Sequence, residues 1–160
     1  MPQLNDIIYI LKPDIIPNEL RYSLRSVEAN FPHRKVFFVC GQPKGFEPDG
    51  RIQHKQTGVT KWEMIKSSMW EVIRSTEVTD DFFLFNDDFF VMQPVEGEFV
   101  NYVDRTLCER VDELRREVHK WLNPYGRTLL KAQQELHALG ATAYNFEVHL
   151  PMLFNKQIAA

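Results

Sequence analysis

FFLFNDDFF, residues 82–90, is the stretch that decides the fold of this chain. Its four large apolar side chains, Phe82 to Phe85, predict a buried strand, because a short continuous apolar run is typical of a strand covered on both faces. The run ends abruptly at Asn86-Asp87-Asp88. An open parallel sheet binds ligands beyond the carboxyl ends of its strands. The stretch therefore predicts polar side chains at a ligand-binding edge.

Two further apolar runs lie upstream of this stretch. Asp6–Leu11 and Lys35–Cys40 are short, rich in apolar side chains and closed by proline or glycine, which predicts two more buried strands. Arg51–Gln56 is expected to add a short edge strand. The sheet is therefore expected to contain several short strands separated along the chain by helices.

Helices are predicted where apolar side chains recur at helical spacing. Residues 19–31 contain one such repeat, and Thr60 with Glu63 three residues later has the capping-box pattern that starts another helix. The order of these elements predicts an α/β fold with a mostly parallel sheet flanked by helices and a helical C-terminal segment.

The C-terminal third of the chain is more charged. Asp104–Trp121 and Thr128–Leu139 are predicted helices, and the alternating run Tyr144–Pro151 is a predicted strand. We expect one domain over residues 1–160, with a core at about 5–95, a helical insertion at about 100–140 and a late strand at about 143–155.

The overall composition limits the classes of function. The chain has 160 residues and a formal net charge of −3, which gives no general electrostatic reason to expect nucleic acid as a partner. Cys40 and Cys108 are expected to be buried thiols rather than a disulfide. The first residues lack a signal-peptide pattern, and no run of about 18 apolar residues occurs. We therefore expect a cytoplasmic protein without a membrane span.

The Asn86–Asp88 motif is the first candidate site. Carboxylate oxygens are hard ligands that suit Mn²⁺ or Mg²⁺, and such an ion commonly takes one or two carboxylates together with phosphate oxygens of a substrate. Asp87 and Asp88 are the predicted metal ligands, and Asp88 is also a predicted catalytic residue. The alternative is a surface turn between two apolar segments, since Asn and Asp favour turns.

Three segments together carry a resemblance to a known family. NELRYSLRSVE (18–28), KVFFV (35–39) and FLFNDDFF (83–90) appear in the same order in the Stealth proteins, which the chain resembles over roughly residues 5 to 95. Stealth proteins are capsular-polysaccharide sugar-phosphate transferases, related to the animal enzyme that makes the lysosomal mannose-6-phosphate tag. The resemblance implies a GT-A-like, Rossmann-like fold, in which a DxD-type acidic motif binds a metal and a nucleoside diphosphate. Asn86 departs from the DxD pattern, as the Stealth pattern itself does, and the chain is shorter than those relatives.

Cationic residues near the predicted carboxyl edge are candidates for binding the nucleotide. Arg21 and Arg25 lie one helical turn apart, and guanidinium groups bind phosphate in a bidentate manner. Lys61 opens the helix after Thr60, where a cation and the helix N-terminus can both meet a diphosphate. For all three residues the alternative is an exposed helix surface. The predicted nucleotide-binding set is Lys12, Arg21, Arg25, Lys61 and Asn86.

The late alternating run supplies the candidate base. Glu147 and His149 are two residues apart, so they share one face of the predicted strand and can converge on one point. Imidazole transfers protons near neutral pH and is a good Mn²⁺ ligand, so both residues are predicted to be catalytic and His149 also to be a metal ligand. A structural histidine in an apolar strand is the alternative.

These residues together favour a metal-dependent transferase that moves a sugar or a sugar phosphate from a nucleotide sugar to an acceptor hydroxyl. The expected partners are a nucleotide-sugar donor and a glycan or other hydroxyl acceptor, and the expected cofactor is Mn²⁺ or Mg²⁺. The alternative is a non-catalytic nucleotide-sugar or glycan-binding module of the same fold, which the short C-terminal region favours. A metal-dependent nuclease fits the acids but not the charge balance.

Overall fold

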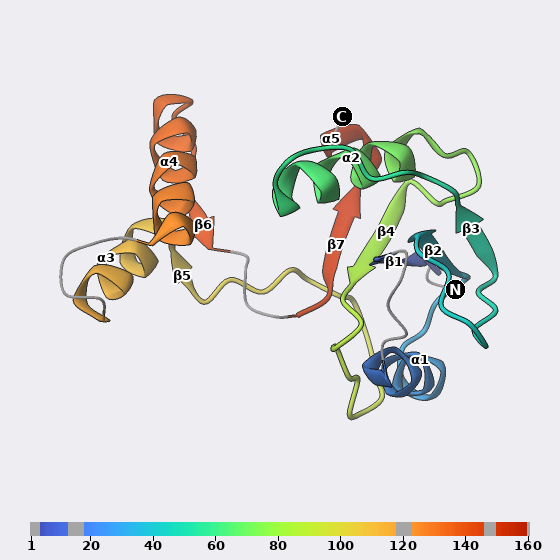
Figure 1. Cartoon of the computed structure of the whole chain (residues 1–160). Coiled ribbons are helices and arrows are strands. Elements are labelled where there is room, and N and C mark those ends of the chain that lie inside the picture. Colours follow the sequence, from blue (N-terminus) through green and yellow to red (C-terminus); the bar gives the residue numbers. More distant parts are fainter. Residues whose placement is uncertain (1–3, 13–17, 118–122, 146–149, 160) are drawn as a thin grey trace. The chain divides into compact units, whose positions relative to one another are not determined.

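The computed structural model describes residues 4–12, 18–117, 123–145 and 150–159. The chain divides into two compact units, each described by itself below. Unit 1 is formed by Met1–Val100 with Pro151–Ala160, and unit 2 by Asn101–Leu150. Unit 1 carries the main sheet, and unit 2 carries a pair of helices with a two-stranded sheet (Figure 1).

The sheet of unit 1 has five strands in the order β3-β2-β1-β4-β7. β1 is central and pairs in parallel with β2 and β4; β3 pairs in parallel with β2, and β7 pairs antiparallel with β4. The predicted fold class is therefore confirmed as α/β with a mostly parallel five-stranded sheet flanked by helices. The strands are β1 (Asp6–Leu11), β2 (Val36–Cys40), β3 (Gly50–Ile52), β4 (Asp81–Phe85) and β7 (Met152–Asn155).

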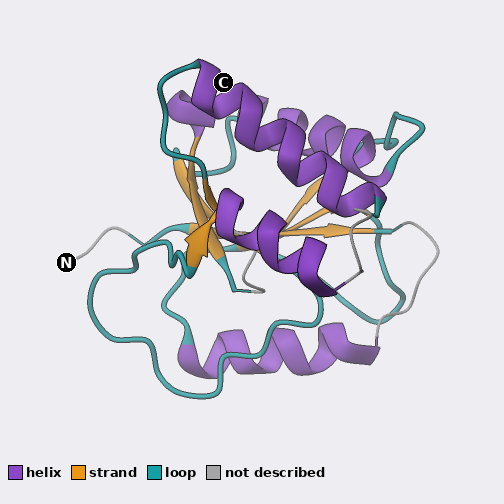
Figure 2. Cartoon of the chain, turned by 90° about the vertical axis from the view of Figure 1, so that its left-hand side faces the viewer, coloured by secondary structure: helices purple, strands orange, loops and turns teal. Residues whose placement is uncertain are grey.

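Both faces of the central strands are buried, which explains their continuous apolar runs. Ile7 and Tyr9 of β1 pack with apolar side chains of α1 (Asn18–Asn30) on one face. Ile8 packs with Val72 of α2 (Lys61–Arg74) on the opposite face. α1 runs along its face below the strands in Figure 2.

The two longer helices of unit 1 begin close to where the sequence predicts. α1 covers Asn18–Asn30, against an expected 19–31. α2 covers Lys61–Arg74, and the predicted capping box is confirmed: the Thr60 hydroxyl accepts the Glu63 N–H, and the Glu63 carboxylate accepts the Thr60 N–H. A third, short helix is α5 (Lys156–Ala159).

Polar side chains form hydrogen bonds and an ion pair at the amino ends of β1 and β4. Arg34 binds the buried carboxylate of Asp6, and Asp6 also accepts the backbone N–H of Thr79 at 2.8 Å. The buried ammonium of Lys156 donates to the carbonyls of Ser75 and Val78, both at 2.6 Å. These contacts satisfy buried polar groups and give this edge a structural role.

Unit 2 is a helical pair with a small apolar core. Leu107, Val111 and Leu114 of α3 pack against Leu129 of α4. Arg105 bridges Asp104 and Glu113, and Arg110 also binds Glu113. The elements are β5 (Arg105–Thr106), α3 (Leu107–Glu117), α4 (Pro124–Ala138) and β6 (Tyr144–Asn145).

Two sequence predictions need correction here. The late strand is not continuous: Tyr144–Asn145 pairs with β5 in unit 2, whereas Met152–Asn155 joins the main sheet of unit 1. Cys108 is exposed rather than buried, because it lies on the solvent side of α3 outside the apolar core, and both cysteines are free thiols. Within the described residues, no helix has the length and apolar character needed to cross a membrane.

Candidate functional site

The order of strands identifies the edge at which open α/β sheets commonly bind ligands. The chain proceeds from β1 to β2 and β3 on one side, then returns to form β4 on the other side of β1. Such a switch point opens a crevice at the carboxyl ends of the two strands that flank it. Lys12 directly follows β1 and Asn86 directly follows β4, so both residues lie at this crevice.

Residues Asn86–Asp88, here called the acidic turn, change the direction of the chain at the end of β4. The N–H of Phe89 donates to the carbonyl of Asn86 at 3.2 Å, and the Phe89 ring packs on Phe85 with centroids 6.3 Å apart. Asn86 and Asp88 are exposed, whereas Asp87 is half-buried. The Asn86–Asp88 motif is therefore a turn, as the alternative interpretation of the sequence predicts. It also lies at the carboxyl edge of the sheet.

A buried pair of hydroxyl groups lies near the end of β4, since Tyr9 pairs with Phe85. The Tyr9 hydroxyl is 2.7 Å from the Ser23 hydroxyl, and both side chains are buried between β1 and α1. Burial raises the pKa of Tyr9 well above its usual value; the bond with Ser23 opposes this rise, and the negative charge of Asp87 adds to it.

The segment after the acidic turn is hydrogen-bonded to α1. The hydroxyl of Ser26 accepts the Val91 N–H at 2.9 Å, and the Asn30 amide donates to the Val91 carbonyl at 2.6 Å. The Asn30 carbonyl in turn accepts the Val95 N–H at 2.8 Å. The chain that leaves the turn is therefore held along α1.

The end of β2 presses closely against the end of β1. Gly41 donates its N–H to the Leu11 carbonyl at 3.0 Å, and a Cβ at this glycine would lie 2.3 Å from the Lys12 carbonyl oxygen. Cys40 just before it has a φ of +70°, which is uncommon for a residue other than glycine. Only glycine, which has no Cβ, can lie this close to the Lys12 carbonyl.

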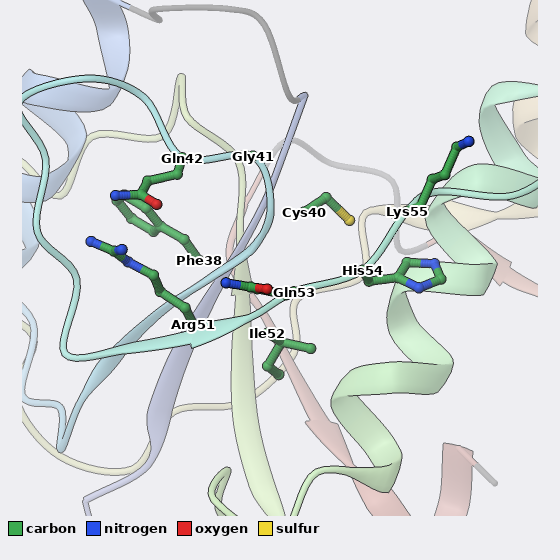
Figure 3. A pocket seen from close by; sticks show the side chains of 9 residues that line it. All are labelled: Phe38, Cys40, Gly41, Gln42, Arg51, Ile52, Gln53, His54 and Lys55. Carbon is green, nitrogen blue, oxygen red and sulfur yellow. The ribbon is translucent and has the colours of Figure 1, made fainter.

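A cavity of about 490 Å³ opens at the carboxyl ends of β2 and β3. Figure 3 shows Gln42 and Arg51 on one side of it, His54 and Lys55 on the other, and the Gln53 amide between them. Hydrogen bonds to α2 support its wall: the thiol of Cys40 binds Ser68, and the His54 ring binds Ser67. Burial raises the pKa of the Cys40 thiol, which disfavours the nucleophilic thiolate form.

Three lysines near this edge are free to meet an anion. Lys12 follows β1, Lys55 follows β3 and Lys61 opens α2, and all three are exposed. No ion pair joins them to a carboxylate in the described part of the chain. The edge therefore combines carboxylates beyond β4 with unpaired cations beyond β1 and β3.

The structure places the two predicted arginines on another flank of α1. The Arg21 guanidinium lies 5.8 Å from the centroid of the Phe46 ring. Arg25 borders a separate hollow together with Glu28, Glu47 and Asp49. Helix α1 instead turns Ser26 and Asn30 toward the acidic turn, so neither arginine converges with its carboxylates.

The predicted base lies outside the described residues, which omit 146–149 and hence Glu147 and His149. Among the residues that are described, no group of three or more His, Cys, Asp or Glu side chains could hold a metal. Asp87 and Asp88 are nevertheless adjacent, accessible and acidic. Two carboxylates fit Mn²⁺ or Mg²⁺, which complete their coordination with water and substrate phosphate.

No protein-family model matches this chain, and a search of curated proteins finds no match to it either. The resemblance to the Stealth proteins therefore stays a prediction from the sequence.

Sequence reasoning overlooked the polar residues that the structure gathers around the acidic turn. Ser23 and Ser26 lie on either side of Leu24 and Arg25, in the run Ser-Leu-Arg-Ser. Their spacing of three residues, continued by Asn30 four residues later, places them on one face of a helix. That spacing was the available signal, because small hydroxyl side chains inside an amphipathic helix need a partner when they are buried.

Proposed function

We propose that this chain is a metal-dependent transferase with a GT-A-like fold that moves a sugar or a sugar phosphate from a nucleotide sugar to an acceptor hydroxyl. One observation carries the proposal: two adjacent carboxylates, Asp87 and Asp88, begin one residue beyond the strand that flanks the switch point of a mostly parallel sheet. Ligands of such sheets bind at this point. The Stealth resemblance supports the same choice of reaction.

The charges along the edge support a diphosphate as the shared part of the ligand. Asp87 and Asp88 would hold Mn²⁺ or Mg²⁺, which supplies positive charge to the phosphate oxygens and to a leaving group. Lys12 and Lys61 would neutralise charge on the same diphosphate from the ends of β1 and α2. Asn86 adds an amide that can accept or donate a hydrogen bond.

The cavity beyond β2 and β3 supports a nucleoside as the remaining part of the donor. Neighbouring strands are about 4.8 Å apart, so the cavity is about 10 to 14 Å from the end of β4. That distance suits a nucleoside whose diphosphate reaches the acidic turn. Gln42 and Gln53 offer amides to the edge of a base, and Arg51 has further N–H donors besides the one that binds Glu47.

The acceptor side of the reaction depends on the sequence prediction for Glu147 and His149. One of these residues would take the proton from the acceptor hydroxyl. Sugar transfer breaks the anomeric C–O bond, whereas sugar-phosphate transfer breaks a P–O bond. The residues named here serve both reactions.

Thermal-shift measurements test the proposed donor. UDP- and GDP-linked sugars are added with Mn²⁺, with Mg²⁺ and with EDTA. We expect at least one donor to raise the melting temperature only when the divalent ion is present. A protein whose melting temperature responds to no nucleotide in any of these conditions contradicts the proposal.

A binding module of the same fold is the second candidate. The position of Arg21 and Arg25 away from the acidic turn favours it, since fewer cations then remain to stabilise a transition state. Hydrolysis of the donor separates the two functions, because transferases of this kind release sugar or sugar phosphate slowly to water. A protein that binds the donor with Mn²⁺ but never hydrolyses or transfers it is a binding module.

A further inference from the structure

One face of α1 contacts the chain both before and after the acidic turn. Ser23 shares a hydrogen bond with Tyr9, which pairs with Phe85 just before the turn, and Ser26 and Asn30 bind Val91 beyond the turn. We call Ser23, Ser26 and Asn30 the polar stripe. Because residues three and four apart lie on one side of a helix, a single rigid element fixes both flanks of a short turn.

The hydrogen bonds of the polar stripe hold the backbone of Val91 in place. Ser26 donates its hydroxyl hydrogen to the Ser23 carbonyl at 2.7 Å, which leaves its oxygen directed at the Val91 N–H. Asn30 uses its side-chain amide for the Val91 carbonyl and its own carbonyl for the Val95 N–H. Each backbone group of Val91 therefore has its partner on α1.

Tyr9 of β1 contacts the last residue of β4. It stands opposite Phe85, the last residue of β4, in the parallel register of β1 and β4, and the two rings are 5.7 Å apart. Asp87 follows Phe85 by two residues. The Tyr9 ring therefore packs at the end of β4, two residues before Asp87.

We propose that the polar stripe and Tyr9 are positioning residues that hold Asp87 in the orientation needed to bind a divalent cation. This inference rests on the proposed function, because it assigns Asp87 to a metal. Outer groups that orient a ligating carboxylate change metal affinity by about 10- to 100-fold when removed.

Direct titration with Mn²⁺ alone, followed by the electron paramagnetic resonance signal of the free ion, measures this effect without any turnover. The test variants are Tyr9→Phe and Ser26→Ala. The matched control is Ser68→Ala, which removes another buried helix hydroxyl that contacts a strand, on the opposite face of the sheet. Ser26→Thr keeps the hydroxyl and serves as the rescue.

We expect Tyr9→Phe and Ser26→Ala to bind Mn²⁺ about 10- to 100-fold more weakly than the wild type. Ser68→Ala should lose comparable thermal stability but keep the wild-type affinity for Mn²⁺, and Ser26→Thr should recover most of that affinity. Amide hydrogen exchange at Val91 should become faster in Ser26→Ala and stay unchanged in Ser68→Ala. Amide hydrogen exchange is measured on the metal-free protein, so an unfolded variant is recognised by fast exchange throughout the chain.

Wild-type affinity for Mn²⁺ in both test variants overturns the positioning role and leaves the proposed metal site standing. An equal loss of affinity in Ser68→Ala also overturns it, because the effect is then one of general stability. A wild-type protein that binds no Mn²⁺ overturns the proposed metal site, and this inference fails with it.

Discussion

Arg34 forms a bidentate ion pair with the buried carboxylate of Asp6: its Nε lies 2.8 Å from Oδ1, and its Nη2 lies 2.5 Å from Oδ2. The Asp6 side chain is fully buried, whereas 38% of the Arg34 side chain is exposed. The pair is at the amino ends of the strands, and the acidic turn is at the carboxyl end of β4. Stability can therefore be perturbed here without touching the candidate site.

Arg34→Met is expected to lower the free energy of unfolding substantially, because it leaves the Asp6 carboxylate buried without its cation. Loss of one partner of a buried pair costs about 3–5 kcal/mol, and the lower end applies here since Thr79 still donates to Asp6. Chemical denaturation measures the change. Arg74→Met, which removes a surface pair with Glu71, is the control and should cost about 0–1 kcal/mol. Equal stability of the two variants contradicts the prediction.

Asp88→Asn is expected to abolish the stabilisation that Mn²⁺ and a nucleotide sugar give together, because a ligand is lost and no packing is changed. A ligand at about 100 times its dissociation constant stabilises a protein by roughly 2.7 kcal/mol, which is visible in a melting curve. Asp80→Asn is the matched control, since Asp80 is exposed just before the other end of the same strand. A full metal-dependent shift in Asp88→Asn means that the metal lies elsewhere.

Lys12→Ala and Arg25→Ala are expected to differ in their effects on donor binding. Lys12 lies at the crevice, so its loss should weaken binding of a nucleoside diphosphate by about 1.5–3 kcal/mol, the range for a hydrogen bond to a charged group. Arg25 borders another hollow, so its loss should cost about 0–1 kcal/mol of stability and leave affinity unchanged. Isothermal titration calorimetry gives both affinities. The reverse result restores Arg25 to the phosphate site.

Glu113→Gln is expected to lower the melting temperature near neutral pH but not in acid. Hydrogen bonds from Arg110 and Arg105 hold the pKa of Glu113 below its usual value. The stabilisation is therefore complete above the unfolded-state pKa of about 4.3 and disappears as the pH falls through the lower folded-state pKa. Melting curves between pH 7 and pH 3 follow this loss.

The control for this pH dependence is Glu135→Gln. Glu135 lies 3.7 Å from Lys131 on an exposed helix surface, where an ion pair contributes little. Its variant should melt close to the wild type at every pH. A constant difference between Glu113→Gln and the wild type across the whole pH range contradicts the linkage to ionisation.

Much of the fold could be predicted because the deciding signals are local. The apolar runs of the central strands identify a sheet that is covered on both faces, and the Thr60–Glu63 capping box locates the start of α2. Strand β7 illustrates the opposite case. Met152–Asn155 has no alternating pattern, and it is extended because it pairs with the free edge of β4. Pairing between distant segments overrides local preference there.

The candidate site was predicted only in part, for a similar reason. That the acidic turn follows β4 could be inferred from the end of an apolar run, but the side chains around it come from three separate elements. The helical pattern of α1 shows which residues share a face, but not which neighbour that face meets. Charge alone favours the arginines as binding residues, whereas the contacts to Tyr9 and Val91 are made by small polar side chains.

The position of β7 in the chain has a consequence for how the protein is made. The ribosome delivers β1 to β4 first and the whole of residues 101–150 next, and only then the strand that covers the edge of β4. During that interval the nascent chain presents an unpaired parallel-sheet edge, the kind of surface that recruits strands from other molecules. Chains that terminate before residue 151 would keep that edge open permanently, so aggregation is the expected fate of such fragments.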